Sequence, residues 1–276
     1  MIFYILYYYK MKNIQQIKNK KREEFAQRYY NKDYSQLNLI ESKVIDTNAE
    51  IFAYIESIIP DNYIKYTIHD FTGNKNDSGT KLIDTTVARN AKDIICKYCW
   101  GKRWTDINNK DDETIKKILR NKEVIEERFN NGNNVVIYGS SKAPMGRTLI
   151  ASIMMKEIIK MRQKPSCKTH TYDWVDFSTL IQSLAGKDTN ESANYYACDW
   201  LVVDDINRNF FVTQAQKNYI AECISPFFSK RLRNRQPTIL VFRFDITDDN
   251  LILENEMGMG ISSIINNNRT FLIPLS

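Results

Sequence analysis

The sequence is short of the features that mark secreted and membrane proteins. Its five cysteines among 276 residues follow no regular spacing, which excludes a disulfide framework and favours free thiols in a reducing compartment. The apolar opening, residues 1–9, is far shorter than the roughly 20 residues that a membrane-spanning helix needs. It also lacks the basic start and the cleavage site of a signal peptide. We therefore expect a cytoplasmic protein that engages no membrane, with residues 1–10 as an over-extended or disordered start.

Internal repeats and heptad runs are missing as well, which argues against a repeat array or a coiled coil. What is present is a hydrophobic content of 43%, enough for one substantial core plus a smaller appendage. The 39 Lys and Arg residues exceed the 33 Asp and Glu residues and give a net charge of +6. Such a balance suits an anionic partner such as nucleic acid without requiring one.

Composition divides the chain into three regions. Residues 1–60 are rich in Lys, Glu, Gln and Asn with scattered Ile, Leu and Tyr, which predicts a helical amino-terminal extension. Residues 61–130 are predicted to form a weakly ordered connecting module, with a flexible loop at 73–79 and a helix over 111–130. In residues 131–276 short apolar runs alternate with longer amphipathic ones.

The third region has the pattern of an α/β protein, because apolar runs separated by helical segments are typical of a parallel sheet. The predicted strands are Val135–Tyr138, Thr169–Val175, Trp200–Val203, Thr238–Phe242 and Thr270–Pro274. The predicted helices are Thr148–Arg162, Phe177–Leu184 and Thr213–Arg233. The predicted fold class is therefore α/β, a five-stranded parallel sheet flanked by helices, preceded by a mostly helical extension.

A loop containing glycine joins the first predicted strand to the first predicted helix. Backbone N–H groups in such a loop and the positive end of the following helix can cradle phosphate, and a threonine hydroxyl at this position coordinates Mg²⁺. We therefore predict ATP and Mg²⁺ as cofactors, with Thr148 as a metal ligand. The candidate nucleotide-binding residues are Gly139, Ser140, Ser141, Gly146, Arg147, Thr148 and Leu149.

This loop departs from the usual phosphate-binding pattern in two ways. Arg147 stands where a lysine is usual, and Gly139 lies seven residues before Gly146 instead of five. Arginine grips phosphate bidentately but differs from lysine in bulk and geometry, so nucleotide binding can survive while hydrolysis slows. Taken alone, the loop is also compatible with an ordinary strand-turn-helix connection.

Two adjacent carboxylates, Asp204 and Asp205, follow the apolar strand 200–203. In P-loop enzymes the first acid at such a strand end holds the magnesium shell and the second polarises the attacking water. Asp204 is therefore a predicted metal ligand and Asp205 a predicted catalytic residue. A helix cap would also place paired acids here, but the phosphate loop upstream favours the Walker B pattern.

A basic cluster supplies the third element. The segment 227–241 ends a helix in basic residues around Arg231 and passes through Pro237-Thr238 into an apolar strand. With the phosphate loop and the paired acids, this order resembles the DnaC/IstB-like AAA+ ATPases over residues 133–276. The resemblance implies that Arg231 is an arginine finger, a catalytic residue that completes the ATP site of a neighbouring subunit, and hence that the chain forms a homo-oligomer. A solvated basic helix end is the alternative.

The same resemblance implies partners. In DnaC-like loaders, which act in DNA replication, an amino-terminal extension docks on the DnaB-like replicative helicase while the ATPase core grips single-stranded DNA. Residues 1–60 are then the candidate docking element, although helical packing against the core is an alternative. An IstB-like transposition helper would have the same core. The family has a small polar residue at the strand end where this chain has Arg243. Because Arg147 also departs from the family pattern, a degenerate interaction module that does not hydrolyse ATP is a further alternative.

Two further signals precede the core. Cys96 and Cys99 have the spacing of a zinc knuckle, but a complete set of four ligands is not apparent, so buried thiols are the expectation. The segment 97–104 carries two tryptophans among three basic residues. Such a segment can contact nucleic acid through stacking and charge, or it can pack beneath the sheet.

Overall fold

The chain forms two compact units in the computed structural model. Unit 1 comprises Met1–Lys65 and Met155–Thr169, and unit 2 comprises Tyr66–Met154 and His170–Ser276. Within the described residues, none of the helices combines the length and the apolar character that a membrane span requires. The structure describes residues 2–68, 85–107, 110–119, 123–139, 144–160, 170–187, 189–210, 213–247 and 250–275.

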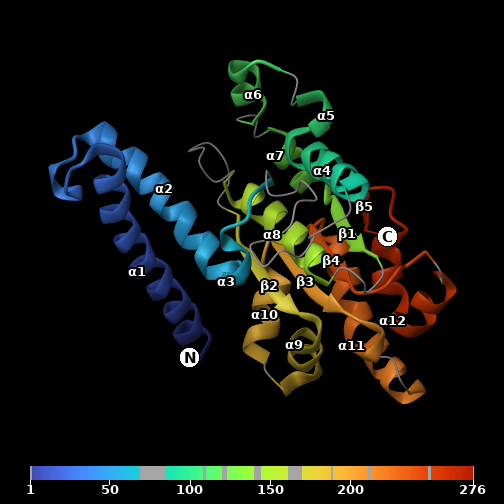
Figure 1. Ribbon diagram of the computed structural model, residues 1–276. Helices are drawn as coiled ribbons and strands as arrows, with labels where there is room; N and C mark the ends of the chain where they lie inside the picture. The colour runs from blue at the N-terminus through green and yellow to red at the C-terminus, as the bar shows by residue number, and fades with distance from the viewer. Residues whose placement is uncertain are drawn as a thin grey trace. The chain divides into compact units, whose positions relative to one another are not determined.

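Unit 1 contains a helical hairpin (Figure 1). Its elements are α1 (Ile2–Tyr30), the 3-10 turn η1 (Tyr34–Gln36), α2 (Leu39–Ile58) and α3 (Asp61–Ile64). Helix α2 begins where the Asn38 side chain accepts from the N–H groups of Ile40 and Glu41, while the Glu41 carboxylate accepts from the Asn38 N–H. This reciprocal capping box satisfies donors that the first turn of a helix leaves open.

The two long helices of this hairpin are held together along one side. Phe25 of α1 packs with Ile45 and Ala49 of α2 in a small buried cluster. Beside that cluster, the Arg22 Nε lies 2.6 Å from the Asp46 Oδ1. Half-exposed ion pairs of this kind contribute little stability individually. The apolar contact between the two helices therefore contributes most of the stability of the hairpin.

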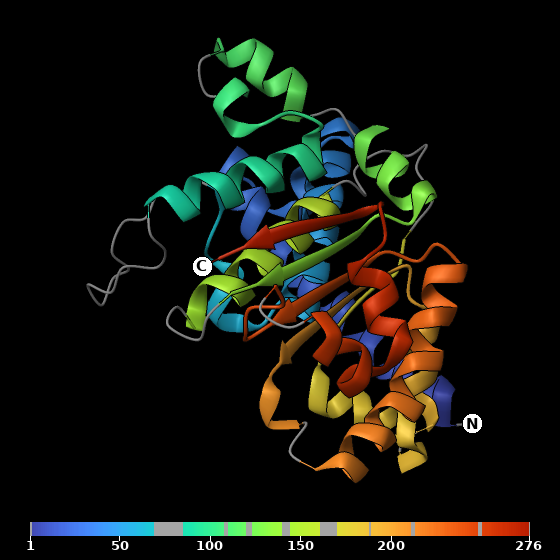
Figure 2. The same ribbon diagram turned by 90° about the vertical axis from the view of Figure 1, so that its right-hand side faces the viewer.

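Unit 2 is built on a five-stranded sheet in the order β2-β3-β4-β1-β5, and every pair of neighbours is parallel (Figures 1 and 2). This confirms the predicted fold class. The strands are β1 (Asn134–Tyr138), β2 (Tyr172–Asp176), β3 (Trp200–Ile206), β4 (Thr238–Phe242) and β5 (Thr270–Pro274). The helices are α4 (Thr85–Trp100), α5 (Trp104–Ile107), α6 (Asp112–Leu119), α7 (Glu123–Asn131), α9 (Phe177–Gln182), α10 (Thr189–Ala197), α11 (Gln214–Arg233) and α12 (Asn250–Ile265), with short segments η4 (Ser183–Lys187) and η5 (Arg208–Phe210). Helix α8 (Pro144–Lys160) belongs to unit 2 up to Met154 and to unit 1 from Met155.

The sheet is covered on both faces, because successive strand residues point to opposite sides. On one face Leu201 and its neighbours pack with apolar residues of α9, α11 and α12 in the main core. On the other face the Trp200 ring lies 6.3 Å from the Tyr98 ring of α4 and 6.1 Å from the Phe129 ring of α7, between centroids. Burial on both faces explains why the inner strands β1, β3 and β4 are largely apolar.

Several boundaries differ from the sequence prediction. Helix α8 begins at Pro144 instead of Thr148, because proline has its φ preset for the first helical position and lacks an N–H that would need a partner there. The helix expected over 111–130 is two helices, α6 and α7. Strand β2 lies at Tyr172–Asp176, whereas the prediction began at Thr169, outside the described residues.

The largest difference concerns the region expected to be weakly ordered. It contains the sixteen-residue helix α4, on which Cys96 and Cys99 are buried on either side of Tyr98. Within the described ranges, no group of three or more His, Cys, Asp or Glu residues could hold a metal ion. The helix was missed because its apolar side is interrupted by charged residues whose burial depends on tertiary contacts, as the 6% exposure of Lys92 shows.

Candidate nucleotide site

The carboxyl ends of the five parallel strands lie at one end of the sheet of unit 2 (Figure 2). Backbone hydrogen bonds link them beyond the regular ladders: the Gly139 N–H donates to the Phe244 carbonyl at 3.2 Å, and the Arg243 N–H donates to the Ile206 carbonyl at 2.8 Å. The residues that follow β1, β3 and β4 therefore lie close together. This edge is where open α/β sheets bind their ligands.

Gly139 has to be glycine for two reasons. Its φ is +153°, and a Cβ atom at this position would lie 2.8 Å from the backbone carbon of Leu275. The end of β5 therefore approaches the chain at the point where β1 turns into the loop, since the Leu275 N–H also donates to the Tyr138 carbonyl at 2.8 Å. Ser140 and Ser141, the next predicted residues, lie outside the described residues.

The loop leads into the amino terminus of α8, which carries Gly146, Arg147, Thr148 and Leu149 near its start. The first N–H groups of a helix have no partner inside the helix, and the helix dipole adds partial positive charge there. An anion such as a phosphate group is stabilised in this position.

Arg147 is turned into the protein. Its side chain is only 2% exposed, and its Nη1 donates to the Gly139 carbonyl at 2.8 Å. Burial lowers the pKa of the guanidinium and the positive charge of Arg243 lowers it further, while Asp204 and Asp205 act in the opposite direction. Arg147 therefore links the start of α8 to the end of β1, where a lysine would extend toward phosphates.

The two predicted magnesium ligands meet across the site. The Thr148 hydroxyl lies 3.3 Å from the Asp204 Oδ1, which also accepts from the Asp205 N–H at 2.7 Å. Asp204 is buried, and this burial, with the nearby charges of Asp176 and Asp205, raises the pKa of its carboxyl to about 6. Two hard oxygen donors fit Mg²⁺, which keeps several waters and takes few protein ligands.

Asp205 lies beside them but points its carboxylate elsewhere. Its φ is +61°, a left-handed conformation that aspartate tolerates better than most residues. The Oδ1 atom forms an ion pair with the Arg243 guanidinium and accepts from the Asn207 Nδ2 at 3.3 Å. The predicted catalytic carboxylate is therefore engaged by the residue that stands at the end of β4.

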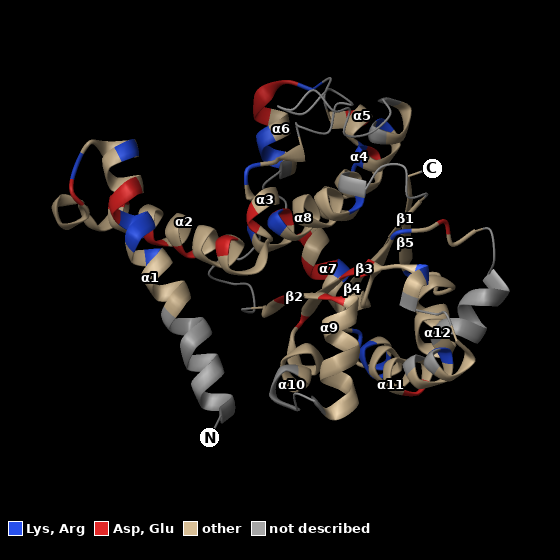
Figure 3. Ribbon diagram, turned by 60° about the horizontal axis from the view of Figure 1, so that its bottom comes forward, with Lys and Arg blue, Asp and Glu red and all other residues tan. Residues whose placement is uncertain are grey.

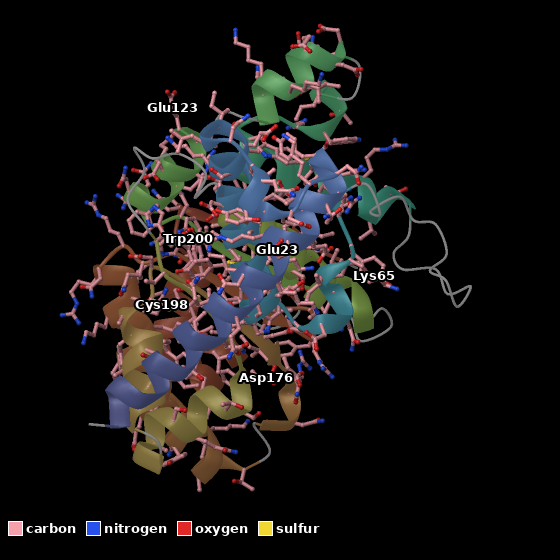
Figure 4. All side chains as sticks on the ribbon, turned by 90° about the vertical axis from the view of Figure 1, so that its left-hand side faces the viewer. Glu23, Lys65, Glu123, Asp176, Cys198 and Trp200 are labelled. Carbon is pink, nitrogen blue, oxygen red and sulfur yellow. The ribbon has the colours of Figure 1, made fainter. Side chains whose placement is uncertain are left out.

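Two site residues were not predicted as functional. Asp176 ends β2 directly opposite Asp204 in the strand register, and it is labelled in Figure 4. Desolvation raises the pKa of its carboxyl, and the charge of Asp205 adds to that effect. Arg243 was noted only as a departure from the family pattern. Both could have been found by asking which polar residues end neighbouring parallel strands.

Comparisons with known proteins give likenesses to two solved structures at low identity. No protein-family model matches the sequence, and no curated protein matches it. A crystal structure of DnaI is similar to the chain with a TM-score of 0.40 and 17% identity over 67% of this chain and 90% of that one. The structure of AMPPCP-bound DnaA from Aquifex aeolicus gives a TM-score of 0.38 and 18% identity, covering 56% of this chain and 45% of that one. The parallel five-stranded sheet with its flanking helices is an α/β fold.

Arg231 lies away from this candidate nucleotide site. It ends α11 next to the amino-terminal edge of the sheet, near Cys198 and Trp200, both labelled in Figure 4. Its side chain has no exposed surface. The guanidinium donates at 2.8 to 3.4 Å to the Thr238 hydroxyl and to the carbonyls of Tyr195, Cys198, Asp199 and Pro237. A finger must reach out of its own subunit, so this geometry favours a structural role for Arg231.

Proposed function

We propose that this chain is an ATP-binding, magnesium-dependent ATPase that acts in DNA replication as a DnaC-like helicase loader. One observation carries the proposal: the Thr148 hydroxyl and the Asp204 carboxylate meet at the amino end of α8, with Asp205 adjacent. A phosphate-binding helix end opposite paired acids is the arrangement that phosphoryl-transfer chemistry needs.

In this proposal the residues have separate tasks. The N–H groups at the start of α8 hold the phosphates of ATP, and Thr148 and Asp204 hold Mg²⁺, which neutralises charge developing on the phosphate oxygens. Asp205 orients and polarises the attacking water. To do so it has to leave the Arg243 guanidinium, so hydrolysis requires a rearrangement at the end of β4.

The proposed partners are a DnaB-like replicative helicase, single-stranded DNA and further copies of this chain. For the helicase, the amino-terminal hairpin is the proposed docking element. Large apolar side chains are exposed on it, including Leu39 at 84% and Ile40 at 77%, with Val44 one turn further along α2. Exposed apolar residues gathered on one element are typical of a protein-interaction surface.

A second candidate function is a nucleotide-binding module that does not hydrolyse. The engagement of Arg147 by the Gly139 carbonyl and of Asp205 by Arg243 favours it, because both groups would have to move before turnover. An IstB-like transposition helper would use the same site, and recovery of a transposase without a helicase in a pull-down would identify it.

The test separates binding from turnover. Binding of a fluorescent ATP analogue is titrated with and without Mg²⁺, and phosphate release is measured with and without single-stranded DNA. Thr148→Ala is expected to abolish the magnesium-dependent part of the affinity, because the hydroxyl ligand is removed. Thr179→Ala, at an exposed position of α9, is the matched control. Nucleotide binding that is equal in both variants would exclude the site.

A further inference from the structure

A groove lies on unit 2 at the junction of α4, α5 and α6. Its volume is about 660 Å³. Four of its lining residues are basic, and Asp106 is its one carboxylate among the described residues. Figure 3 colours the Lys and Arg positions of α4 and α6 blue on the ribbon. The lining residues are Lys97, Gly101, Lys102, Arg103, Thr105, Asp106, Lys110, Thr114 and Ile118.

The four cations of this basic groove, Lys97, Lys102, Arg103 and Lys110, are all exposed. Within the described part of the chain none of them forms an ion pair. Other lysines of the protein do: the Lys116 Nζ lies 3.1 Å from the Glu113 Oε1 on α6. Four cations with one carboxylate, Asp106, among the described lining residues leave an excess of positive charge, and a polyanion relieves the repulsion between the cations.

The fold holds these cations on a fixed frame. Helix α4 ends at Gly101, whose φ of +73° turns the chain while its N–H donates to the Lys97 carbonyl at 3.1 Å. The start of α5 is fixed because the Thr105 N–H and hydroxyl both donate to the Asp93 carboxylate, at 3.0 and 3.3 Å. The backbone that carries Lys102 and Arg103 is thus anchored at both ends.

The aromatic residues of the same segment have other partners. Trp100 is only 4% exposed, and the Lys92 Nζ lies 4.2 Å from the centre of the Trp104 ring. Stacking of bases on Trp100 is therefore excluded by its burial, and charge is the property that the groove offers. Cations on flexible side chains contact phosphates and position a nucleic acid without reading its bases.

We propose that the basic groove binds the phosphate backbone of single-stranded DNA independently of sequence. The choice of DNA as the polyanion rests on the proposed function, whereas the groove itself is separate from the nucleotide site. Binding should weaken with salt, because each phosphate contact releases counterions and contributes a slope of about −0.7 on a double-logarithmic plot. Four contacts predict a loss of about 50-fold when the salt concentration rises about fourfold.

The experiment measures fluorescence anisotropy of a labelled oligothymidylate at several salt concentrations. In Lys102→Ala/Arg103→Ala two contacts remain, so the same rise in salt should weaken binding by only about sevenfold. The control is Lys20→Ala/Lys43→Ala, which removes the same charge from exposed positions of α1 and α2 and should keep the full slope. An unchanged slope in the first variant, or an equal reduction in the control, would overturn the proposal. So would tighter binding of a duplex of the same length.

Nucleotide binding of the groove variant is measured in parallel. It is expected to equal that of the unmodified chain, which also shows that the variant is folded. Loss of nucleotide binding along with DNA binding would mean that the substitutions damage the fold. In that case the salt dependence of DNA binding is measured with Lys97→Ala/Lys110→Ala, for which the same reduced slope is predicted, and this second variant decides whether the groove binds DNA. If the unmodified chain binds DNA through the groove but binds no ATP, the proposed function fails and the groove stands.

Discussion

Replacing Arg231 by alanine is predicted to destabilise unit 2 strongly. The substitution removes the donor to five acceptors on two separate segments, 195–199 and 237–238. Each buried polar group left without a partner costs about 1–3 kcal/mol, and breaking a buried charged network typically costs about 3–5 kcal/mol in total. A domain of this kind is stable by about 5–15 kcal/mol, so the loss is a large fraction of its stability.

The assay is unfolding in urea, followed by the fluorescence of tryptophans, of which Trp200 is fully buried at the start of β3. Arg231→Met separates two causes, because methionine fills most of the volume but donates no hydrogen bond. It should remain destabilised by most of the same amount. Arg233→Ala, at an exposed position two residues later, should change the free energy of unfolding by less than about 0.5 kcal/mol.

The opposite pattern would refute this reasoning. If Arg231→Ala unfolds at the same urea concentration as the unmodified chain but no longer hydrolyses ATP, the arginine acts in catalysis. Addition of subunits that carry Asp205→Asn with an intact Arg231 would then restore turnover, as expected of a residue that acts across a subunit boundary. Reduced stability without such rescue establishes the structural role.

Two further predictions concern the nucleotide site. Arg243→Ala should release Asp205 and raise the rate of basal ATP hydrolysis about two- to fivefold, because the energy of a partly exposed ion pair corresponds at most to a factor of this size. The rate is measured as phosphate release at steady state. A loss of activity would instead mean that Arg243 assists hydrolysis. Gly139→Ala should lower the melting temperature, because the new Cβ meets the Leu275 backbone at 2.8 Å and strain of this kind costs about 1–3 kcal/mol. An unchanged melting temperature would show that β5 can move away.

Local patterns were enough to predict the frame of the site. The end of β1 is marked in the sequence by an apolar run followed by glycine. The end of β3 is marked by an apolar run followed by paired acids. Parallel-sheet topology then predicts that Thr148 and Asp204 share one edge, and the structure places their oxygens 3.3 Å apart. Strands β4 and β5 coincide with their predicted bounds because β4 is a buried apolar run that ends at polar residues, and β5 carries three successive apolar residues and ends at a proline.

Side-chain partners were not predictable in the same way. Arg231 stands in a basic cluster and resembles a solvated helix end, yet the carbonyls of Tyr195 and Cys198, more than 30 residues away in the chain, and of Pro237 converge on it. Arg243 pairs with Asp205 because β4 lies next to β3 in the sheet. No local sequence pattern predicts which strands are neighbours. Sequence periodicity reports burial of apolar groups, whereas burial of a charged group is decided by what the completed fold places around it.

The backbone contact between Gly139 and Leu275 has a practical consequence for anyone labelling this protein. Leu275 lies beside the end of β1, next to the candidate nucleotide site. A purification tag attached just after this residue would be held close to that candidate site, so the tag belongs elsewhere. A small fluorophore attached there would instead sense, at close range, any change that a nucleotide makes in the loop.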